Sequence, residues 1–268
     1  MSGKKTQKRE PKKMVKTVSE GIVEIVSDSG EGAQTCGQLF GTICAKMGNG
    51  IWTVEIIPAE IEPPARSRAG ASGNRIRIGT DQITNFGDEA DVVVAFNEQV
   101  LYSRLDVHAY KSGTRLFLDN KWSNTTDTQI KAAYASAIDE FRTRGLDVME
   151  IPIEEECLKI IPDPRKGKNI WVLGLLCSLY TRDVDLARAE ITAKLKRKGD
   201  EVVRSNVNLF NSGYDWAVAN LQLRYKIPVK SDPKPKLVMN GNQAAALGAM
   251  AAGFEVCAMY PITPATSV

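Results

Sequence analysis

The stretch GIVEIVSDSGEGAQTCGQLFGTICAKMG, residues 21–48, indicates the fold of the chain. It begins as a β-branched run typical of a buried strand and passes into a loop rich in glycine. Apolar residues then recur at helical spacing as far as Met47, and Gly48 is placed to end the helix. A strand, a glycine loop and a helix in this order form the opening unit of an α/β fold.

The same alternation continues along the chain. Residues 61–73 are rich in proline, glycine and arginine, so we expect a long surface loop there, and residues 129–145 read as a helix. From Lys168 to about Tyr225 the apolar spacing is helical and predicts a cap on the sheet. Strands are predicted at residues 52–60, 74–80 (exposed on one face), 90–97, 114–122 and 147–153. The prediction is an α/β fold with a mostly parallel sheet and helices on both faces.

The charge of the chain is uneven. Seven Lys or Arg and one Glu fall in residues 1–16, whereas the whole chain carries only +3. We expect residues 1–18 to be a disordered basic tail. Attachment to nucleic acid or to a membrane is the alternative, but no aromatic residues are interleaved. No apolar segment follows as in a signal peptide, and no run is long enough to span a membrane. We expect neither partner, and a cytoplasmic location.

Five cysteines are scattered along the chain, with no C-x-x-C pair and a single histidine, His108. A four-ligand zinc or iron–sulfur site therefore has no local scaffold, and we expect no metal on this chain. The thiols are expected to be free and mostly buried in a reducing compartment. Cys36, beside the glycine loop, is the one candidate for a reactive thiol.

A second domain is predicted near the end of the chain. Residues 225–236 hold three prolines and several basic residues, which is typical of a linker. From residue 237 to residue 268 the pattern of strand, glycine turn, small-residue helix and strand begins again. About thirty residues cannot bury a core of their own. We therefore expect this segment to be completed by further residues or by another chain.

Two loops carry residues suited to an anion. Gly30 and Gly32 follow a strand and precede a helix, but their spacing matches neither the dinucleotide fingerprint nor the P-loop. A tight turn without a ligand is an equal alternative. Arg66 and Arg68 lie in the second loop, where guanidinium groups suit phosphate or carboxylate, although solvated arginines are also common there.

Side chains alone offer little catalytic chemistry here, so demanding chemistry would need a cofactor. Residues 27–49, 58–79 and 90–101 resemble the γ-type domain of 2-oxoacid:ferredoxin oxidoreductases. Residues 240–267, which contain the motif YPITPATS, are similar to the start of the α-type pyrimidine domain of the same enzymes. The order γ then α in one chain resembles the α subunit of the 2-oxoglutarate enzymes. It places the γ domain at residues 19–224 and an incomplete α domain at residues 237–268.

The resemblance implies a thiamine diphosphate enzyme. It would decarboxylate a 2-oxoacid oxidatively to acyl-CoA and pass electrons to ferredoxin, or run in reverse as a carboxylase. Thiamine diphosphate with Mg²⁺ and a [4Fe–4S] cluster would sit mainly on a separate β subunit, with coenzyme A as co-substrate. The partners implied are this β subunit, ferredoxin and the remainder of the α domain, and the chain alone is not expected to be active.

The resemblance also implies roles for single residues. Thr263 would reach the substrate carboxylate, although a threonine in such a turn can merely cap the next helix. The cofactor cleft would be lined by Tyr260, Pro261, Ile262 and Pro264. The coenzyme A or anion loop would consist of Gly30, Gly32, Gln34, Arg66 and Arg68. No catalytic residue is expected within the chain. Glu31 departs from the family's G-x-G-G-Q-G pattern and places a negative charge in the anion loop.

Other functions stay open at this stage. The same chemistry could act on pyruvate, a branched-chain oxoacid or indolepyruvate instead of 2-oxoglutarate. A non-catalytic assembly module, in which the γ domain only docks partners, is an alternative of another class. A nucleotide-binding Rossmann-type protein is a weaker one, because the glycine spacing is wrong for it.

Overall fold

A computed structural model describes residues 14–57, 71–229 and 237–260. The chain divides into two compact units, residues 1–231 and residues 232–268.

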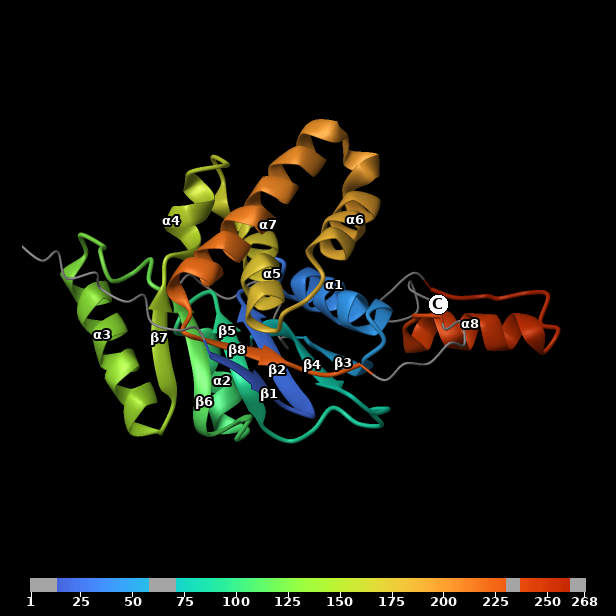
Figure 1. Ribbon diagram of the computed structural model, residues 1–268, viewed down its shortest axis with the longest axis horizontal. Coiled ribbons are helices and arrows are strands. Elements are labelled where there is room, and N and C mark those ends of the chain that lie inside the picture. The colour runs from blue at the N-terminus through green and yellow to red at the C-terminus, as the bar shows by residue number, and fades with distance from the viewer. Residues whose placement is uncertain (1–13, 58–70, 230–236, 261–268) are drawn as a thin grey trace, which may run out of the picture. The chain divides into compact units, whose positions relative to one another are not determined.

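The first unit is built on a six-stranded sheet (Figure 1). Its order is β3-β4-β2-β5-β6-β7, and β2, β5, β6 and β7 run parallel to one another. Only β4 runs against its two neighbours, β2 and β3. The strands are β2 (Glu20–Ser27), β3 (Gly50–Ile56), β4 (Ser72–Gly79), β5 (Ala90–Ala95), β6 (Tyr110–Asp119) and β7 (Asp147–Ile151). The predicted mostly parallel sheet is confirmed.

Helices cover both faces of this sheet, because strands buried on both sides present apolar side chains in both directions. One core joins the sheet to α1 (Ala33–Lys46), α4 (Ile153–Leu158), α5 (Lys168–Leu179), α6 (Val184–Leu195) and α7 (Asp200–Asn220). The core on the other face joins it to α2 (Val100–Asp106) and α3 (Thr128–Thr143). The two-faced α/β prediction and the helical cap are both confirmed.

Two glycines let α5 and α7 pack closely. A Cβ atom at Gly174 would lie 2.1 Å from the carbonyl oxygen of Phe210, and one at Gly213 would lie 1.9 Å from that of Trp171. Backbone therefore meets backbone at this crossing, which explains why an almost wholly buried helix such as α5 contains a glycine.

Strand β4 differs from the prediction of one exposed face. Asn74, Arg75 and Ile76 are all buried. Helix α1 covers one side, and on the other side Arg75 donates from Nε to Glu24 over 2.9 Å. Arg104 also binds this carboxylate. The charged residues of β4 suggest a face exposed to solvent, but Arg75 instead belongs to a buried ion pair with Glu24.

The two ends of the first unit form an additional two-stranded parallel sheet. β1 (Met14–Thr17) pairs with β8 (Leu223–Lys226), with Met14 opposite Leu223. The sequence predicts a disordered tail at residues 14–17 and a linker at residues 225–226, so both boundaries are wrong by a few residues. The pairing joins segments more than 200 residues apart, and local composition carries no signal of it.

The second unit contains α8 (Gly241–Ala251). Asn240 and Gln243 form a capping box at its start, as the sequence NGNQ permits. The strands expected on either side are not formed in residues 237–240 or 252–260. A strand needs a partner strand, and this short unit supplies none in its described part. Among the residues described, no helix is long and apolar enough to cross a membrane.

Candidate functional site

The carboxyl ends of the parallel strands are where open α/β sheets bind ligands. The glycine loop, residues 28–32, follows β2 at this edge and leads into α1. Asn97 follows β5 and donates from Nδ2 to Asp28 over 2.8 Å. Asp119 ends β6, and Glu154 lies in α4 directly after β7. Polar residues at the ends of β5, β6 and β7 therefore lie at the same edge as the glycine loop, which follows β2.

The two glycines of the loop have different surroundings. Gly30 and Gly32 both have positive φ, 87° and 85°. A Cβ atom at Gly32 would lie 2.6 Å from Nδ2 of Asn169, so this glycine is needed for packing. A Cβ atom at Gly30 would meet nothing within 4 Å. The backbone at Gly30 is thus open on the side where a side chain would stand.

The second predicted loop is anchored at the same edge. Arg66 and Arg68 lie outside the described residues, but both flanks of their segment are described. Ile56 at the end of β3 pairs with Gly73, and Ser72 pairs with the last residue of β2. Gln34 donates from Nε2 to the carbonyl oxygen of Ile56 over 3.4 Å. The structure therefore brings the glycine loop, Gln34 and the two ends of the arginine loop together.

A buried ion cluster, which sequence reasoning missed, supports the glycine loop. Lys168 at the start of α5 is fully buried. Its Nζ atom lies 2.7 Å from Glu154 Oε2, 3.1 Å from Asp119 Oδ2 and 3.7 Å from Glu31 Oε1. The only sequence signal is a lysine that opens an otherwise apolar helix, KNIWVLGLLCSL. A buried lysine needs such partners.

One ammonium group is shared by three carboxyl groups, and its charge acts on the pKa values of two of them, Glu31 and Asp119. Burial raises the pKa of Glu31 and of Asp119, and the attraction of Lys168 only partly offsets it. Burial alone would lower the pKa of Lys168, but the carboxylates outweigh burial and raise it. The Glu31 side chain is buried and points into the protein, with its Oε1 atom 3.7 Å from Nζ of Lys168. Its carboxyl group therefore does not occupy the outer side of the loop, although the sequence places an acidic residue there.

Lys121, just beyond β6, is a second cation at this edge that the sequence did not single out. It is half-buried, and its charge acts on both Glu31 and Asp119. Its Nζ atom lies 4.9 Å from the centre of the Trp122 ring, a cation–π contact. No ion pair joins Lys121 to another described residue, so its charge is available at the rim of the site.

The other predicted site residues belong to the second unit, apart from Cys36. Tyr260 is exposed, and Pro261, Ile262, Thr263 and Pro264 lie outside the described residues. Cys36 is fully buried, and burial raises the pKa of its thiol, which argues against the alternative of a reactive thiol there. The prediction of free and mostly buried thiols is confirmed, since four of the five are buried. In the part of the chain that is described, no three His, Cys, Asp or Glu side chains are grouped to hold a metal ion.

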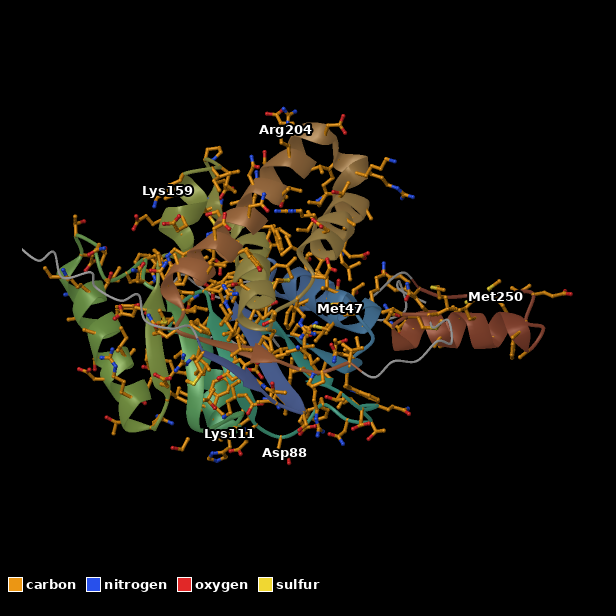
Figure 2. All side chains as sticks on the ribbon, viewed as in Figure 1. Met47, Asp88, Lys111, Lys159, Arg204 and Met250 are labelled. Atoms are coloured by element: carbon orange, nitrogen blue, oxygen red, sulfur yellow. The ribbon has the colours of Figure 1, made fainter. Side chains whose placement is uncertain are left out.

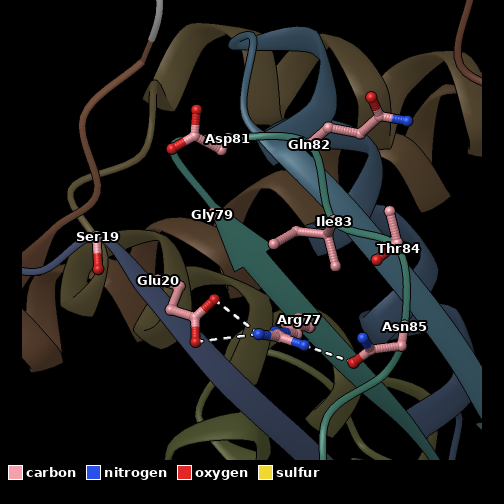
Figure 3. A pocket seen from close by; sticks show the side chains of 9 residues that line it. All are labelled: Ser19, Glu20, Arg77, Gly79, Asp81, Gln82, Ile83, Thr84 and Asn85. Atoms are coloured by element: carbon pink, nitrogen blue, oxygen red, sulfur yellow. Dashed lines mark hydrogen bonds and ion pairs between the residues drawn. The ribbon is translucent and has the colours of Figure 1, made fainter.

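A pocket of about 220 Å³ lies at the opposite edge, beside the start of β2 and the end of β4 (Figure 3). Arg77 is its main charged group. It already binds both carboxylate oxygens of Glu20, at 3.1 and 2.9 Å, and Oδ1 of Asn85. With its arginine occupied, this pocket is a weaker candidate than the carboxyl edge.

Residues 23–216 match the family model described as pyruvate ferredoxin/flavodoxin oxidoreductase. This match covers well over half of the chain, and the chain therefore belongs to that family. The resemblance drawn from the sequence is confirmed.

Particular relatives agree with this assignment. The chain is 28% identical over 263 residues to the 2-oxoglutarate oxidoreductase subunit KorA of Mycobacterium tuberculosis, covering 92% of this chain and 40% of KorA. A solved 2-oxoglutarate:ferredoxin oxidoreductase from Magnetococcus marinus, with 2-oxoglutarate, coenzyme A and succinyl-CoA bound, matches with a TM-score of 0.72 and 26% identity. That match covers 93% of this chain and 40% of the other. The chain thus spans two fifths of the length of these relatives.

A separate γ subunit has the same fold. The γ subunit of a keto/oxoacid ferredoxin oxidoreductase from Geobacter sulfurreducens matches with a TM-score of 0.53 and 15% identity. The match covers 75% of this chain and 98% of that subunit.

Proposed function

We propose that this chain is part of a 2-oxoacid:ferredoxin oxidoreductase, with 2-oxoglutarate as its substrate. The enzyme would form acyl-CoA and carbon dioxide and pass electrons to ferredoxin, or carry out the reverse carboxylation. Support comes from the family match and from the two relatives whose names include 2-oxoglutarate. Residues 19–224 would be its γ-type domain and residues 237–268 the start of its α-type domain. Four buried free thiols suit a reducing cytoplasm.

The cofactors would be held mainly by a partner β subunit that carries the [4Fe–4S] cluster. Thiamine diphosphate, bound there with Mg²⁺, supplies the electron sink for the loss of carbon dioxide. The contribution of this chain would be Thr263, whose hydroxyl group between Pro261 and Pro264 would donate to the substrate carboxylate. Tyr260 and Ile262 would line the same cleft. The reaction would also need the remainder of the α domain and the β subunit, so the chain alone should not convert the substrate.

The glycine loop would bind a phosphate group of coenzyme A. The observation that carries this proposal is the open backbone at Gly30, where a Cβ atom would have no neighbouring atom within 4 Å. The first turn of α1 has no acidic residue and no side-chain cap, so its amide groups remain for an anion. Gly32 and Gln34 would hold the loop in shape. Lys121, Arg66 and Arg68 would add positive charge.

The reaction is tested with the assembled complex. The full-length subunit containing this chain is expressed with its β subunit, and reduction of a viologen dye is followed. Reduction should require both 2-oxoglutarate and coenzyme A. If the complete complex reduces the dye with pyruvate but not with 2-oxoglutarate, the substrate is pyruvate and the proposed substrate is wrong. A complex that is inactive with every oxoacid would leave only an assembly role.

The glycine loop is tested with a matched pair of variants. Asparagine tolerates positive φ, so Gly30→Asn adds a side chain to the open space with little strain. Gly113→Asn is the control, since Gly113 also has positive φ (84°) and nothing within 4 Å, but lies in β6 away from the loop. We expect Gly30→Asn to raise the KM for coenzyme A about tenfold and Gly113→Asn to leave it unchanged. Equal KM values would refute the loop as the coenzyme A site.

Thr263 is tested in the same assay. Thr263→Val keeps the shape of the side chain and removes the hydroxyl group. It should weaken binding of 2-oxoglutarate and leave the KM for coenzyme A unchanged, whereas Thr266→Val should affect neither. A Thr263→Val enzyme with normal kinetics would show that this threonine only caps a helix.

A further inference from the structure

Helices α6 and α7 form a hairpin that rises away from the sheet (Figure 1). They are joined by a short 3-10 turn, Lys196–Lys198, and by Gly199 at φ 101°. None of residues 192–208 is buried, and Leu209 is the first fully packed residue of α7. We call residues 192–208 the hairpin arm. It contributes little to the core, so its length and composition need another explanation.

The tip of the hairpin arm is strongly basic. Its five cations are exposed and make no ion pair with any other described residue: Lys194, Lys196, Arg197, Lys198 and Arg204. Figure 2 labels Arg204 at this tip. Lower on the hairpin, Arg188 binds Asp185 over 3.1 Å, and Glu190 binds Lys46 of α1 over 2.5 Å. The unpaired charges are therefore confined to the tip.

The helix dipole explains only part of this pattern. Lysines at the end of α6 and the acidic Asp200 and Glu201 at the start of α7 follow the dipole rule. Arg204 does not, since it lies in the first half of α7, where the dipole gives a cation no advantage. Five cations against two acidic residues leave the tip with a net positive charge.

The composition of the tip indicates a weak, charge-driven contact. Its apolar residues, Leu195, Val202 and Val203, are half-buried within the hairpin, and no aromatic residue lies in the arm. A permanent subunit interface would need an apolar centre, and a membrane contact would need exposed apolar side chains. Single-stranded nucleic acid would be held by aromatic stacking, which the arm lacks. A small, charged surface suits a transient protein partner.

We propose that the basic tip of the hairpin arm is a docking site for an acidic protein electron carrier. This inference rests on the proposed function, under which the electrons leave on a separate protein. Complementary charge would speed encounter and allow rapid release, as repeated electron transfer requires. Binding should therefore weaken as salt screens the charges.

The test compares two double charge reversals in the assembled complex. Lys196→Glu/Lys198→Glu changes the tip. Lys16→Glu/Lys131→Glu makes the same change in net charge on two exposed residues elsewhere. The probe is an oxidised ferredoxin of strongly negative net charge, and its Kd is measured at low and high salt without turnover. We expect the tip variant to weaken binding at low salt about tenfold and to flatten the salt dependence, with the control close to wild type.

Dye reduction by the same complexes separates this inference from the proposed function. A small viologen needs no docking site, so the tip variant should reduce it at the wild-type rate. Absence of dye reduction in the wild type would reject the proposed function, while the Kd values would still decide the docking site. Equal ferredoxin Kd values for the two variants would overturn the inference. So would loss of the β subunit from the tip variant, or tighter binding of the tip to a short oligonucleotide or to anionic vesicles than to ferredoxin.

Discussion

Nζ of Lys168 lies 3.1 Å from Oδ2 of Asp119, and both side chains are fully buried. Lys168 opens α5, and Asp119 ends β6, so this pair joins the helical cap to the carboxyl edge of the sheet. Because Glu31 shares the same ammonium group, the pair also fixes the inner side of the glycine loop. The loop proposed to bind coenzyme A thus depends on a lysine that is buried behind it.

Replacing Lys168 should strongly destabilise the fold. Lys168→Met leaves Asp119 and Glu31 buried without a counter-charge, which costs about 3–5 kcal/mol. Lys166→Met, two residues away on an exposed side chain, should cost almost nothing. Urea unfolding at pH 7 measures both, and similar midpoints for the two variants would contradict the structural role of Lys168.

Glu31 should make stability depend on pH. Its pKa is raised above the ordinary 4.5, chiefly by burial, so the folded chain binds this proton more tightly than the unfolded chain. The contribution of Glu31 is therefore greatest below pH 4.5 and falls as the pH rises through the raised pKa. Wild type should lose stability relative to Glu31→Gln over this range. Unfolding curves measured from acid to neutral pH test this difference in stability. Glu89→Gln, at an exposed position, is the control, and its stability should change with pH as that of the wild type does.

The helix crossing at Gly213 should not tolerate a methyl group. Gly213→Ala would place Cβ 1.9 Å from the backbone of α5 and force the helices apart, at a cost of about 1–3 kcal/mol or more. Gly248→Ala in α8 meets nothing within 4 Å and should be neutral or stabilising, since alanine favours helix. Thermal unfolding of the two variants distinguishes a packing effect from a propensity effect. Equal melting temperatures would argue against the close crossing.

Glu24 should contribute strongly to the stability of the fold, on the face of the sheet that lies away from α1. Its carboxylate accepts hydrogen bonds from Arg75, Arg104 and Tyr110, with Tyr110 Oη at 2.8 Å. Glu24→Gln leaves two guanidinium groups without a buried counter-ion, and we expect a loss of about 3–5 kcal/mol. Glu20→Gln breaks only the partly exposed pair with Arg77 and should cost about 0–1 kcal/mol. Chemical denaturation of the two variants gives the comparison directly.

The five thiols should differ sharply in reactivity. Cys257 is exposed, whereas Cys36, Cys44, Cys157 and Cys177 are buried. Burial also raises the pKa of Cys44 to about 11 and that of Cys157 to about 12. A thiol reagent should therefore modify one cysteine quickly in the native chain and the other four only after denaturation. Rapid loss of two or more thiols, or no change in Cys257→Ser, would contradict the burial pattern.

The sequence predicted the parts of the fold that repeat a local pattern. Continuous apolar runs identified β5 and β6, and helical spacing identified α1, α3 and α7. The misjudged parts depend on distant partners. Arg75 lies on the face predicted to be solvated, because its counter-ion is Glu24, 51 residues away. The strand pair β1–β8 and the ion cluster of Lys168 also join distant segments.

The candidate site shows the same division. The motif alone selected Gly30, Gly32 and Gln34 as a candidate anion loop, which stays a prediction. The strand order explains why the arginine loop begins and ends beside them. Lys121 and Lys168 were missed, because the sequence does not show which charged groups surround a lysine in the folded chain. The predicted cleft residues near the end of the chain depend on the family motif, and only Tyr260 among them lies in the described part of the chain.

The pairing of β1 with β8 has an architectural consequence. Because the first strand of the unit hydrogen-bonds to its last, the unit closes on itself and presents both ends at one small sheet. A domain whose two ends lie side by side can be joined to another chain without a change in its core. The same fold matches a γ subunit from Geobacter sulfurreducens over 98% of its length and 40% of a longer chain from Magnetococcus marinus.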